Sequence, residues 1–251
     1  MPLSTWWAEC LRLTRTGRLI VLVGTFVFFG ITGPAVTRYM GEILATAADS
    51  RMRIIMTPPT PADGIISYTS NATQLGMIAA VIVTALACAI DAKPALAVYY
   101  RSRARFADLL LPRVTVIAAG VIAAYLCGML AAWAETVSLI GAPSLPGLLQ
   151  AAALQSLYLV FAVCVTALAA TLVRGVLGTV GTTLIVLLLA PILRNFPAIA
   201  DWTPPTLVAP PAALIVQNGA ADHPRAVAVT LALCCVTLVL ALLRGSRAVA
   251  R

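Results

Sequence analysis

The sequence predicts an all-α, polytopic membrane protein with six transmembrane helices. Hydrophobic residues make up 61% of its 251 residues, charged residues make up only 10%, and the mean hydropathy is +0.98. Soluble domains have about 45–50% apolar and about 25% charged residues. A chain of this composition therefore lacks the polar residues needed to cover a water-exposed surface. The same composition excludes a disordered or collagen-like chain.

Six apolar runs divide the chain, and each has roughly the 20 residues that cross a hydrocarbon layer of about 30 Å as a helix. Helices are expected because backbone groups in lipid must pair within their own segment, and the sequence has none of the alternating segments of a transmembrane β-barrel. The runs extend from Leu19 to Thr37, Leu75 to Ala92, Val114 to Ala134, Leu148 to Val173, Val176 to Leu193 and Ala226 to Leu243.

The basic residues predict that both termini lie in the cytoplasm. The 17 basic and 9 acidic residues give a net charge of +8. The basic residues lie between the apolar runs and form no surface stripe, so we attribute them to topology and expect membrane lipid, not nucleic acid, as a partner. The positive-inside rule is met with the N-terminus inside. The external side then holds only Arg38, Arg51, Arg53, Arg194 and Arg225.

Two segments outside the spans are expected to lie at the inner membrane surface. Residues 1–18 predict an amphipathic interfacial helix, with Trp6 and Trp7 on its apolar side and Glu9 on its polar side. Residues 94–111 predict a second short helix, because Pro94 suits a first helical position and Pro112 a stop. A plain topological loop does not need the tyrosines and arginines of this second segment, so we interpret it as a docking element.

The external segments differ in character. Residues 39–74 are polar and carry Pro58, Pro59 and Pro61, which predicts irregular structure. Residues 198–217 are rich in proline but have an apolar centre, so we expect one or two short helices that dip into the outer leaflet.

Sequence motifs for catalysis and metal binding are missing. There is no Gly-x-Ser-x-Gly elbow, no His-Glu-x-x-His pair and no P-loop, and His223 is the only histidine. The six cysteines include no Cys-x-x-Cys pair. We therefore expect no catalytic residue, no metal and no cofactor, and we expect that the chain is not an enzyme.

Small residues inside the spans predict close helix packing. Gly120, Ala124 and Gly128 recur at four-residue intervals in the third span. The hydroxyls and glycines of the first and fifth spans either pack against other helices or line the path of an amphiphilic substrate.

Several of these features together resemble the permease subunits of type-2 ATP-binding-cassette (ABC) exporters. The resemblance covers nearly the whole chain and combines six spans with an amphipathic N-terminal helix and a proline-rich hairpin before the last span. Its sequence markers are Phe29-Gly30-Ile31-Thr32-Gly33-Pro34, Tyr99-Tyr100-Arg101-Ser102-Arg103-Ala104-Arg105 and Leu109-Leu110-Leu111-Pro112-Arg113.

The resemblance implies a passive half of a dimeric pore in a bacterial inner membrane. ATP would be hydrolysed by separate ABC ATPase subunits, a second permease subunit, identical or paralogous, would complete the pore, and the cargo would be a hydrophobic small molecule such as a drug or a lipid. The family's docking role falls here on Arg12, Arg15, Tyr99, Tyr100, Arg101, Arg103 and Arg105. Its substrate path and dimer interface fall on Thr32, Gly33, Thr182 and Thr183.

Two alternatives remain open from the sequence. A stand-alone secondary transporter or channel would be favoured by an inverted repeat between the two three-span halves, and we find no convincing one. A membrane-embedded enzyme or scaffold is the other.

Overall fold

The computed structural model describes residues 2–47, 58–89, 106–173, 175–196, 200–208 and 224–249, and all regular structure in these ranges is helical. Six helical segments there are long and apolar enough to cross a membrane, which confirms the predicted fold class. In chain order, the elements are α1 (Pro2–Arg15), α2 (Arg18–Ala47), α3 (Pro61–Asn71), the π-helical turn η1 (Ala72–Gly76), α4 (Met77–Cys88), α6 (Phe106–Leu139), α7 (Leu145–Leu172), α8 (Val176–Leu189), the 3-10 helices η3 (Ala190–Asn195) and η4 (Pro204–Leu207), and α11 (Pro224–Val249).

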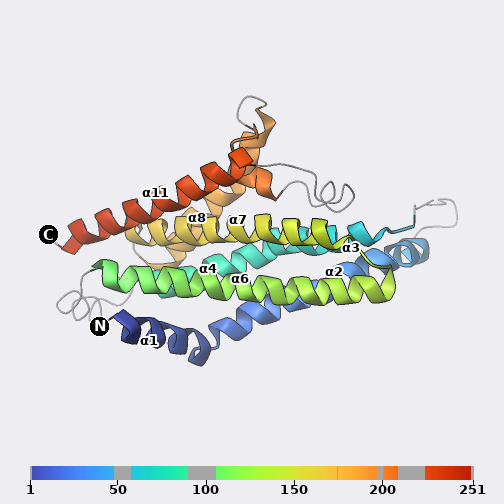
Figure 1. The fold of residues 1–251 in the computed structure, drawn as a ribbon, viewed down its shortest axis with the longest axis horizontal. Coiled ribbons are helices and arrows are strands. Elements are labelled where there is room, and N and C mark those ends of the chain that lie inside the picture. Colours follow the sequence, from blue (N-terminus) through green and yellow to red (C-terminus); the bar gives the residue numbers. More distant parts are fainter. Residues whose placement is uncertain are drawn as a thin grey trace.

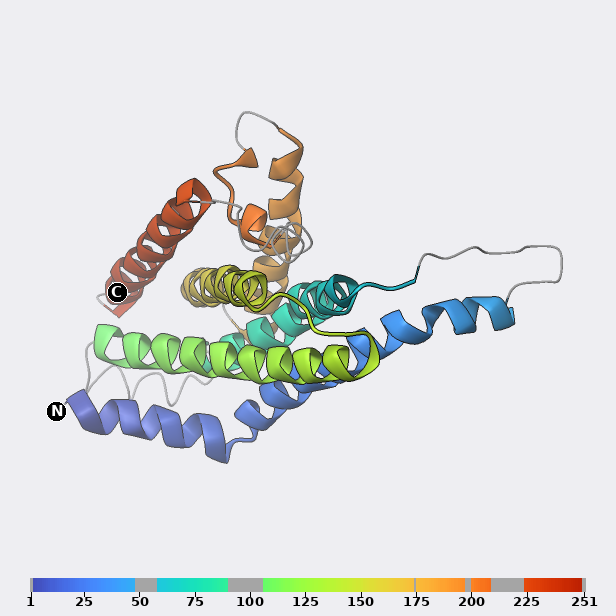
Figure 2. The ribbon, with the colours of Figure 1, turned by 45° about the vertical axis from the view of Figure 1, so that its right-hand side comes forward.

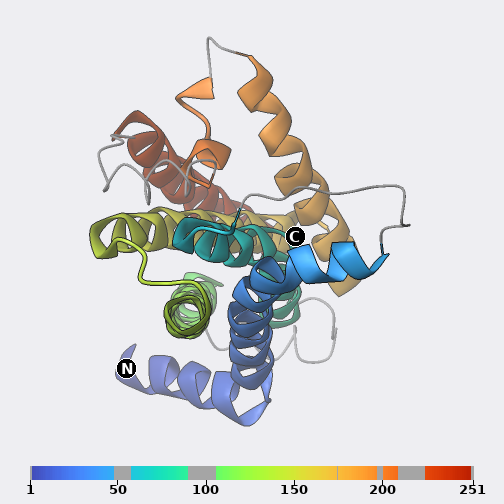
Figure 3. The same cartoon turned by 90° about the vertical axis from the view of Figure 1, so that its right-hand side faces the viewer.

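The spans form an elongated bundle (Figure 1). The helix α1 and the C-terminal end of α11 lie at the same end of it, as an even number of crossings requires. Seen from the end of the bundle, α1, α2 and α6 lie on one side, α3 and α7 in the middle, and α8 and α11 on the other (Figure 3). The helices α8 and α11 lean away from the others (Figure 2), and a smaller share of their spanning residues is buried than in any other span.

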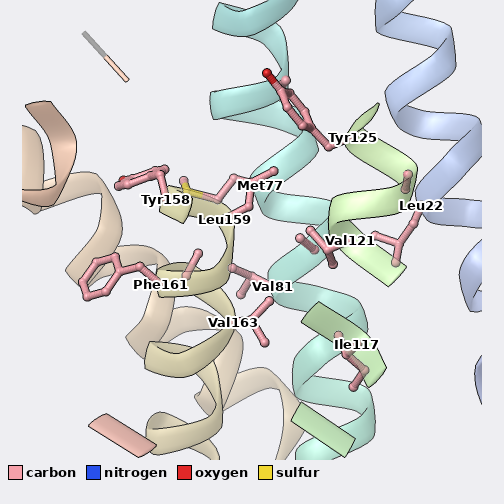
Figure 4. Packing of buried hydrophobic residues seen from close by; sticks show 14 of the residues in the cluster. Leu22, Met77, Val81, Ile117, Val121, Tyr125, Tyr158, Leu159, Phe161 and Val163 are labelled. Atoms are coloured by element: carbon pink, nitrogen blue, oxygen red, sulfur yellow. The ribbon is translucent and has the colours of Figure 1, made fainter. Parts of the chain in front are cut away.

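The core lies where α2, α3, α4, α6 and α7 meet, and Figure 4 shows part of it. Its centre is aromatic. The Tyr68 and Tyr125 rings stack with centroids 5.7 Å apart, and Phe26 meets Tyr125 edge-on at 5.9 Å. The Tyr68 hydroxyl donates to the carbonyl of Tyr125 at 2.7 Å. These three rings therefore join the first three spans.

The predicted close-packing face on the third span is confirmed. A Cβ at Gly128 would lie 2.5 Å from the carbonyl oxygen of Phe26, and a Cβ at Gly30 would overlap the carbonyl oxygen of Gly128. Ala124 is fully buried, and Gly120 is buried where α6 meets Leu13 of α1. The small residues thus allow the backbones of α2 and α6 to come into contact.

The second span begins earlier than predicted. It covers Pro61–Cys88 instead of starting at Leu75, and α2 reaches Ala47, so most of the described part of the expected irregular segment 39–74 is helical. Asp63 caps the new start, because its carboxylate accepts hydrogen bonds from the N–H (2.8 Å) and hydroxyl (2.7 Å) of Thr60. Hydropathy missed this start because the first turns are polar.

The predicted helix stop at Pro112 is wrong. The helix α6 spans Phe106–Leu139 and continues through this proline, which is buried inside it. Proline removes one helical hydrogen bond, but spanning helices tolerate this where neighbouring groups compensate. Residues 90–105 lie outside the described residues. Of the expected helix 94–111, only residues 106–111 are described, and they form the start of α6.

The described part of the expected external helices, residues 200–208, contains one short 3-10 helix. Pro204, Pro205 and Leu207 are buried there, and Leu207 packs with Leu154 of α7 and Ala226 of α11. Residues 209–217 lie outside the described residues. This segment therefore fills the gap between the ends of α7 and α11.

Candidate functional site

A partly buried ion pair joins the N-terminal helix to the spans. The Arg113 Nε donates to the Glu9 Oε1 at 2.9 Å, and the same guanidinium donates through Nη1 to the carbonyl of Ala87 at 3.3 Å. Arg113 is only 3% exposed, and the Glu9 side chain is 18% exposed. One side chain thus connects α1, α4 and α6. We call this group of contacts the inner junction.

Two arginines cap the end of α4 at the inner junction. The last carbonyls of a helix have no partner within it. Here the Arg113 guanidinium reaches Ala87, and the Arg18 Nη2 donates to the carbonyl of Leu86 at 3.5 Å. Positive charge at this end also complements the helix dipole. The end of α4 is therefore held from two sides, by α2 and by α6.

Removing one partner of a buried ion pair generally costs about 3–5 kcal/mol, because the remaining charge stays buried without its counterion. In the pair with Glu9, Arg113 is buried and Glu9 is partly buried, whereas the 3.6 Å contact from Arg12 to Glu9 lies nearer the surface. The Arg113 contact is therefore the stronger of the two.

Two of the predicted docking residues lie next to the inner junction. Arg12 and Arg15 occupy the last turn of α1, where Arg12 contacts Glu9 and Arg15 is exposed. The other five lie outside the described residues: Tyr99, Tyr100, Arg101, Arg103 and Arg105. The segment that carries them follows α4 and precedes α6 in the chain.

The pairing of Glu9 with Arg113 was not predictable from sequence spacing. The two residues are 104 positions apart. One signal was present, because Glu9 is the only acidic residue before Glu42 and stands among arginines. An isolated acid in a basic segment suggests a specific partner, but it does not say which.

The orientation of α1 suits a helix at the membrane surface. Its polar side, with Glu9, faces the protein, and Leu13 is buried against α6. The other side is open, with Trp7 66% and Trp6 40% exposed. Paired tryptophans prefer the headgroup level of a bilayer. The predicted apolar side is thus the side that is free to meet lipid.

The predicted path residues lie on two helices that the structure does not bring together. On α2, Thr32 is half-buried and Gly33 is buried, with a Cβ there 3.1 Å from the backbone nitrogen of Tyr68. On α8, Thr182 is half-buried and Thr183 is fully buried. The helix α2 packs on α3 and α6, whereas α8 packs on α4 and α7. Gly33 and Thr183 therefore contribute to packing within the chain.

A polar residue that the sequence analysis missed lies on the open surface of the second span. Gln74 belongs to the π-helical turn η1, near the middle of Pro61–Cys88, and it is exposed. Its neighbour Thr73 turns inward and accepts a hydrogen bond from the Gln155 Nε2 at 3.0 Å. π-Turns occur often at functional sites. An amide at mid-span has no hydrogen-bond partner in lipid, so its exposure suggests that something other than lipid covers it.

The fold and the inner junction define a class, the multi-pass α-helical membrane proteins with six spans. Within the described ranges, no group of three His, Cys, Asp or Glu side chains is placed to hold a metal ion. Comparison with known protein families, with curated proteins and with solved structures gave no match.

Proposed function

We propose that this chain is the transmembrane permease subunit of an ATP-driven ABC exporter. It moves a hydrophobic or amphiphilic substrate, such as a drug or a lipid, out of the cell with ATP that separate subunits hydrolyse. The observation that carries the proposal is the inner junction, where Arg113 binds both Glu9 of the N-terminal helix and the end of α4. A subunit that receives force from a partner needs such a rigid connection between its docking elements and its spans.

The energy for transport comes from nucleotide binding in the partner subunits. ATP favours the closed pair of ATPases over the open pair, and only this difference in affinity can shift the permease between its states. The docking elements are α1 and the residues between α4 and α6, which include Tyr99 and Tyr100. Both elements connect to the same end of the bundle.

A second permease subunit covers the open face of α2, α4 and α8. The helix α4 packs against both α2 and α8, so it lies between them. The flanking helices expose large apolar side chains, among them Phe28 and Ile31 of α2 and Ile185 of α8. Gln74 lies on the span that includes α4, and a path between two such subunits would hydrate its amide. The half-buried Thr32 and Thr182 lie on the flanking helices.

The positive-inside rule supports the orientation with both termini in the cytoplasm of a bacterial cell, in its inner membrane. In that orientation the inner junction faces the cytoplasm, where ATP and the ATPase subunits are. The ion pair between Arg38 and Glu42, at the other end of α2, then faces outward.

Affinity purification from the native membrane tests the proposal. A tagged chain solubilised in mild detergent is expected to bring down, in a fixed ratio, an ABC ATPase subunit that hydrolyses ATP. As a control, a second tagged six-span protein from the same membrane should not retain that subunit. A chain that purifies alone and transports solute with the energy of an ion gradient would instead support a secondary transporter or channel.

A further inference from the structure

The guanidinium of Arg113 bonds to two helices at once, α1 and α4. Its Nε is bound to the Glu9 carboxylate at 2.9 Å and its Nη1 to the carbonyl of Ala87 at 3.3 Å. The side chain is 3% exposed, so water cannot readily replace either partner. Because a guanidinium is planar and rigid, its two donors hold a fixed geometry relative to one another. The position of Glu9 is therefore tied to the position of the end of α4.

The end of α4 is packed in the core through Ala87 and Cys88, and two of its last carbonyls accept hydrogen bonds from arginine side chains. Ala89, the residue that follows Met77–Cys88, has left the helical conformation. The Ala89 N–H bonds to the carbonyl of Ala85, and the carbonyls of Leu86 and Ala87 accept hydrogen bonds from the Arg18 and Arg113 side chains. A displacement at this end would therefore act directly on the arginines that hold it.

We propose that Arg113 is a positioning residue that makes the end of α4 and the N-terminal helix α1 move as one unit when nucleotide binds to the ATPase subunits. This inference rests on the proposed function. If the proposed function holds, a force on α1 and a force on the chain next to Cys88 move the two docking elements in the same direction and do not pull them apart. Glu9 is equally required, since it is the residue of α1 that Arg113 binds.

Distance measurement between two spin labels tests the inference on the full chain in complex with its ATPase. One label is placed on Cys10, a native and exposed residue of α1, and the other on Leu86→Cys, which is 43% exposed on the last turn of α4. The other five cysteines are replaced by serine or alanine. Distances are recorded without nucleotide and with ATP plus vanadate.

With Glu9 and Arg113 intact, the distance between the labels is expected to stay the same in both states. In Glu9→Gln, we expect it to shift when nucleotide binds, because α1 and α4 then move separately. Glu9→Asp, which keeps a carboxylate for Arg113 to bind and leaves the contact of Arg113 with Ala87 in place, should show much less of this shift. Glu42→Gln, which breaks the exposed pair with Arg38 at the other end of α2, should have no effect.

Three results separate the possible failures. A nucleotide-dependent shift that is already present with both residues intact would overturn the inference, and so would a Glu9→Gln distance that does not respond to nucleotide. A distance that broadens equally with and without nucleotide would show a structural contact only and would also overturn it. Failure of the proposed function looks different, because no ATPase subunit would then bind the chain and ATP hydrolysis would be missing from the preparation.

Discussion

Gly30 of α2 and Gly128 of α6 bring two helix backbones into contact. A Cβ on Gly30 would overlap the carbonyl oxygen of Gly128, and a Cβ on Gly128 would lie 2.5 Å from the carbonyl oxygen of Phe26. Backbone atoms cannot rotate aside as a flexible side chain can. This contact therefore fixes the distance between the first and third spans.

Gly128→Ala is expected to destabilise the protein by about 1–3 kcal/mol, the usual cost of overpacking a well-packed interface. Gly24→Ala is the matched control on α2, because nothing lies within 4 Å of a Cβ at that position. It should leave stability unchanged or raise it by up to about 1 kcal/mol through helix propensity. Thermal unfolding in detergent measures both. Equal effects of the two substitutions would contradict the packing described here.

Loss of the hydroxyl is expected to affect stability differently at Tyr68 and at Tyr125, although the two rings stack. Tyr68→Phe removes a 2.7 Å hydrogen bond to the carbonyl of Tyr125 and should cost about 1 kcal/mol. In the part of the chain that the structure describes, the buried hydroxyl of Tyr125 has no hydrogen-bond partner. Tyr125→Phe should therefore be neutral or stabilising. If Tyr125→Phe lost more stability than Tyr68→Phe in the same unfolding measurement, the arrangement of the two hydroxyls would be wrong.

Hydropathy was sufficient to find the six spans, since long apolar runs have few other uses. It did not find the first turns of the second span, because there the apolar residues occupy only one face. Ile65 and Tyr68 are fully buried, while Asp63 and Ser70 are exposed. A local signal did exist in Thr60-Pro61-Ala62-Asp63, whose residues match a helix start.

Spacing rules predicted contacts within one helix face but not contacts between distant segments. The face of Gly120, Ala124 and Gly128 followed from its four-residue interval. The junction of Glu9 and Arg113 depends on how α1 folds back along α6, which no local pattern encodes. Pro112 shows the reverse problem, because a strong local stop signal was overridden by burial among neighbouring helices.

Gln74→Leu is expected to reduce transport strongly while leaving insertion and stability unchanged, because the side chain is exposed in the single chain and its amide is proposed to face the path. Ile82→Leu is the control, at another exposed position of the same span. The measurement is dye efflux from cells, normalised to the amount of protein in the membrane. If Gln74 simply faced lipid, Gln74→Leu would raise thermal stability and leave efflux intact, which would contradict the proposed open face.

Replacing Tyr99 and Tyr100 together with alanine is expected to uncouple ATP hydrolysis from transport while the protein still inserts. The reason is that both lie in the segment predicted to dock on the ATPase. Tyr39→Ala, an exposed position on the outer part of α2, serves as the control and should change neither activity. Hydrolysis and transport are measured on the same proteoliposomes. Normal transport by the double variant would show that the docking assignment is wrong.

The most direct test of the central claim is transport by purified components in proteoliposomes. The chain is reconstituted with and without the ATPase subunit that co-purifies with it, and uptake of a lipophilic dye into inside-out vesicles is followed before and after ATP is added. We predict uptake only when both the ATPase and ATP are present, and its loss when ATP is replaced by a non-hydrolysable analogue. Uptake by the chain alone, driven by an ion gradient and indifferent to ATP, would contradict the account.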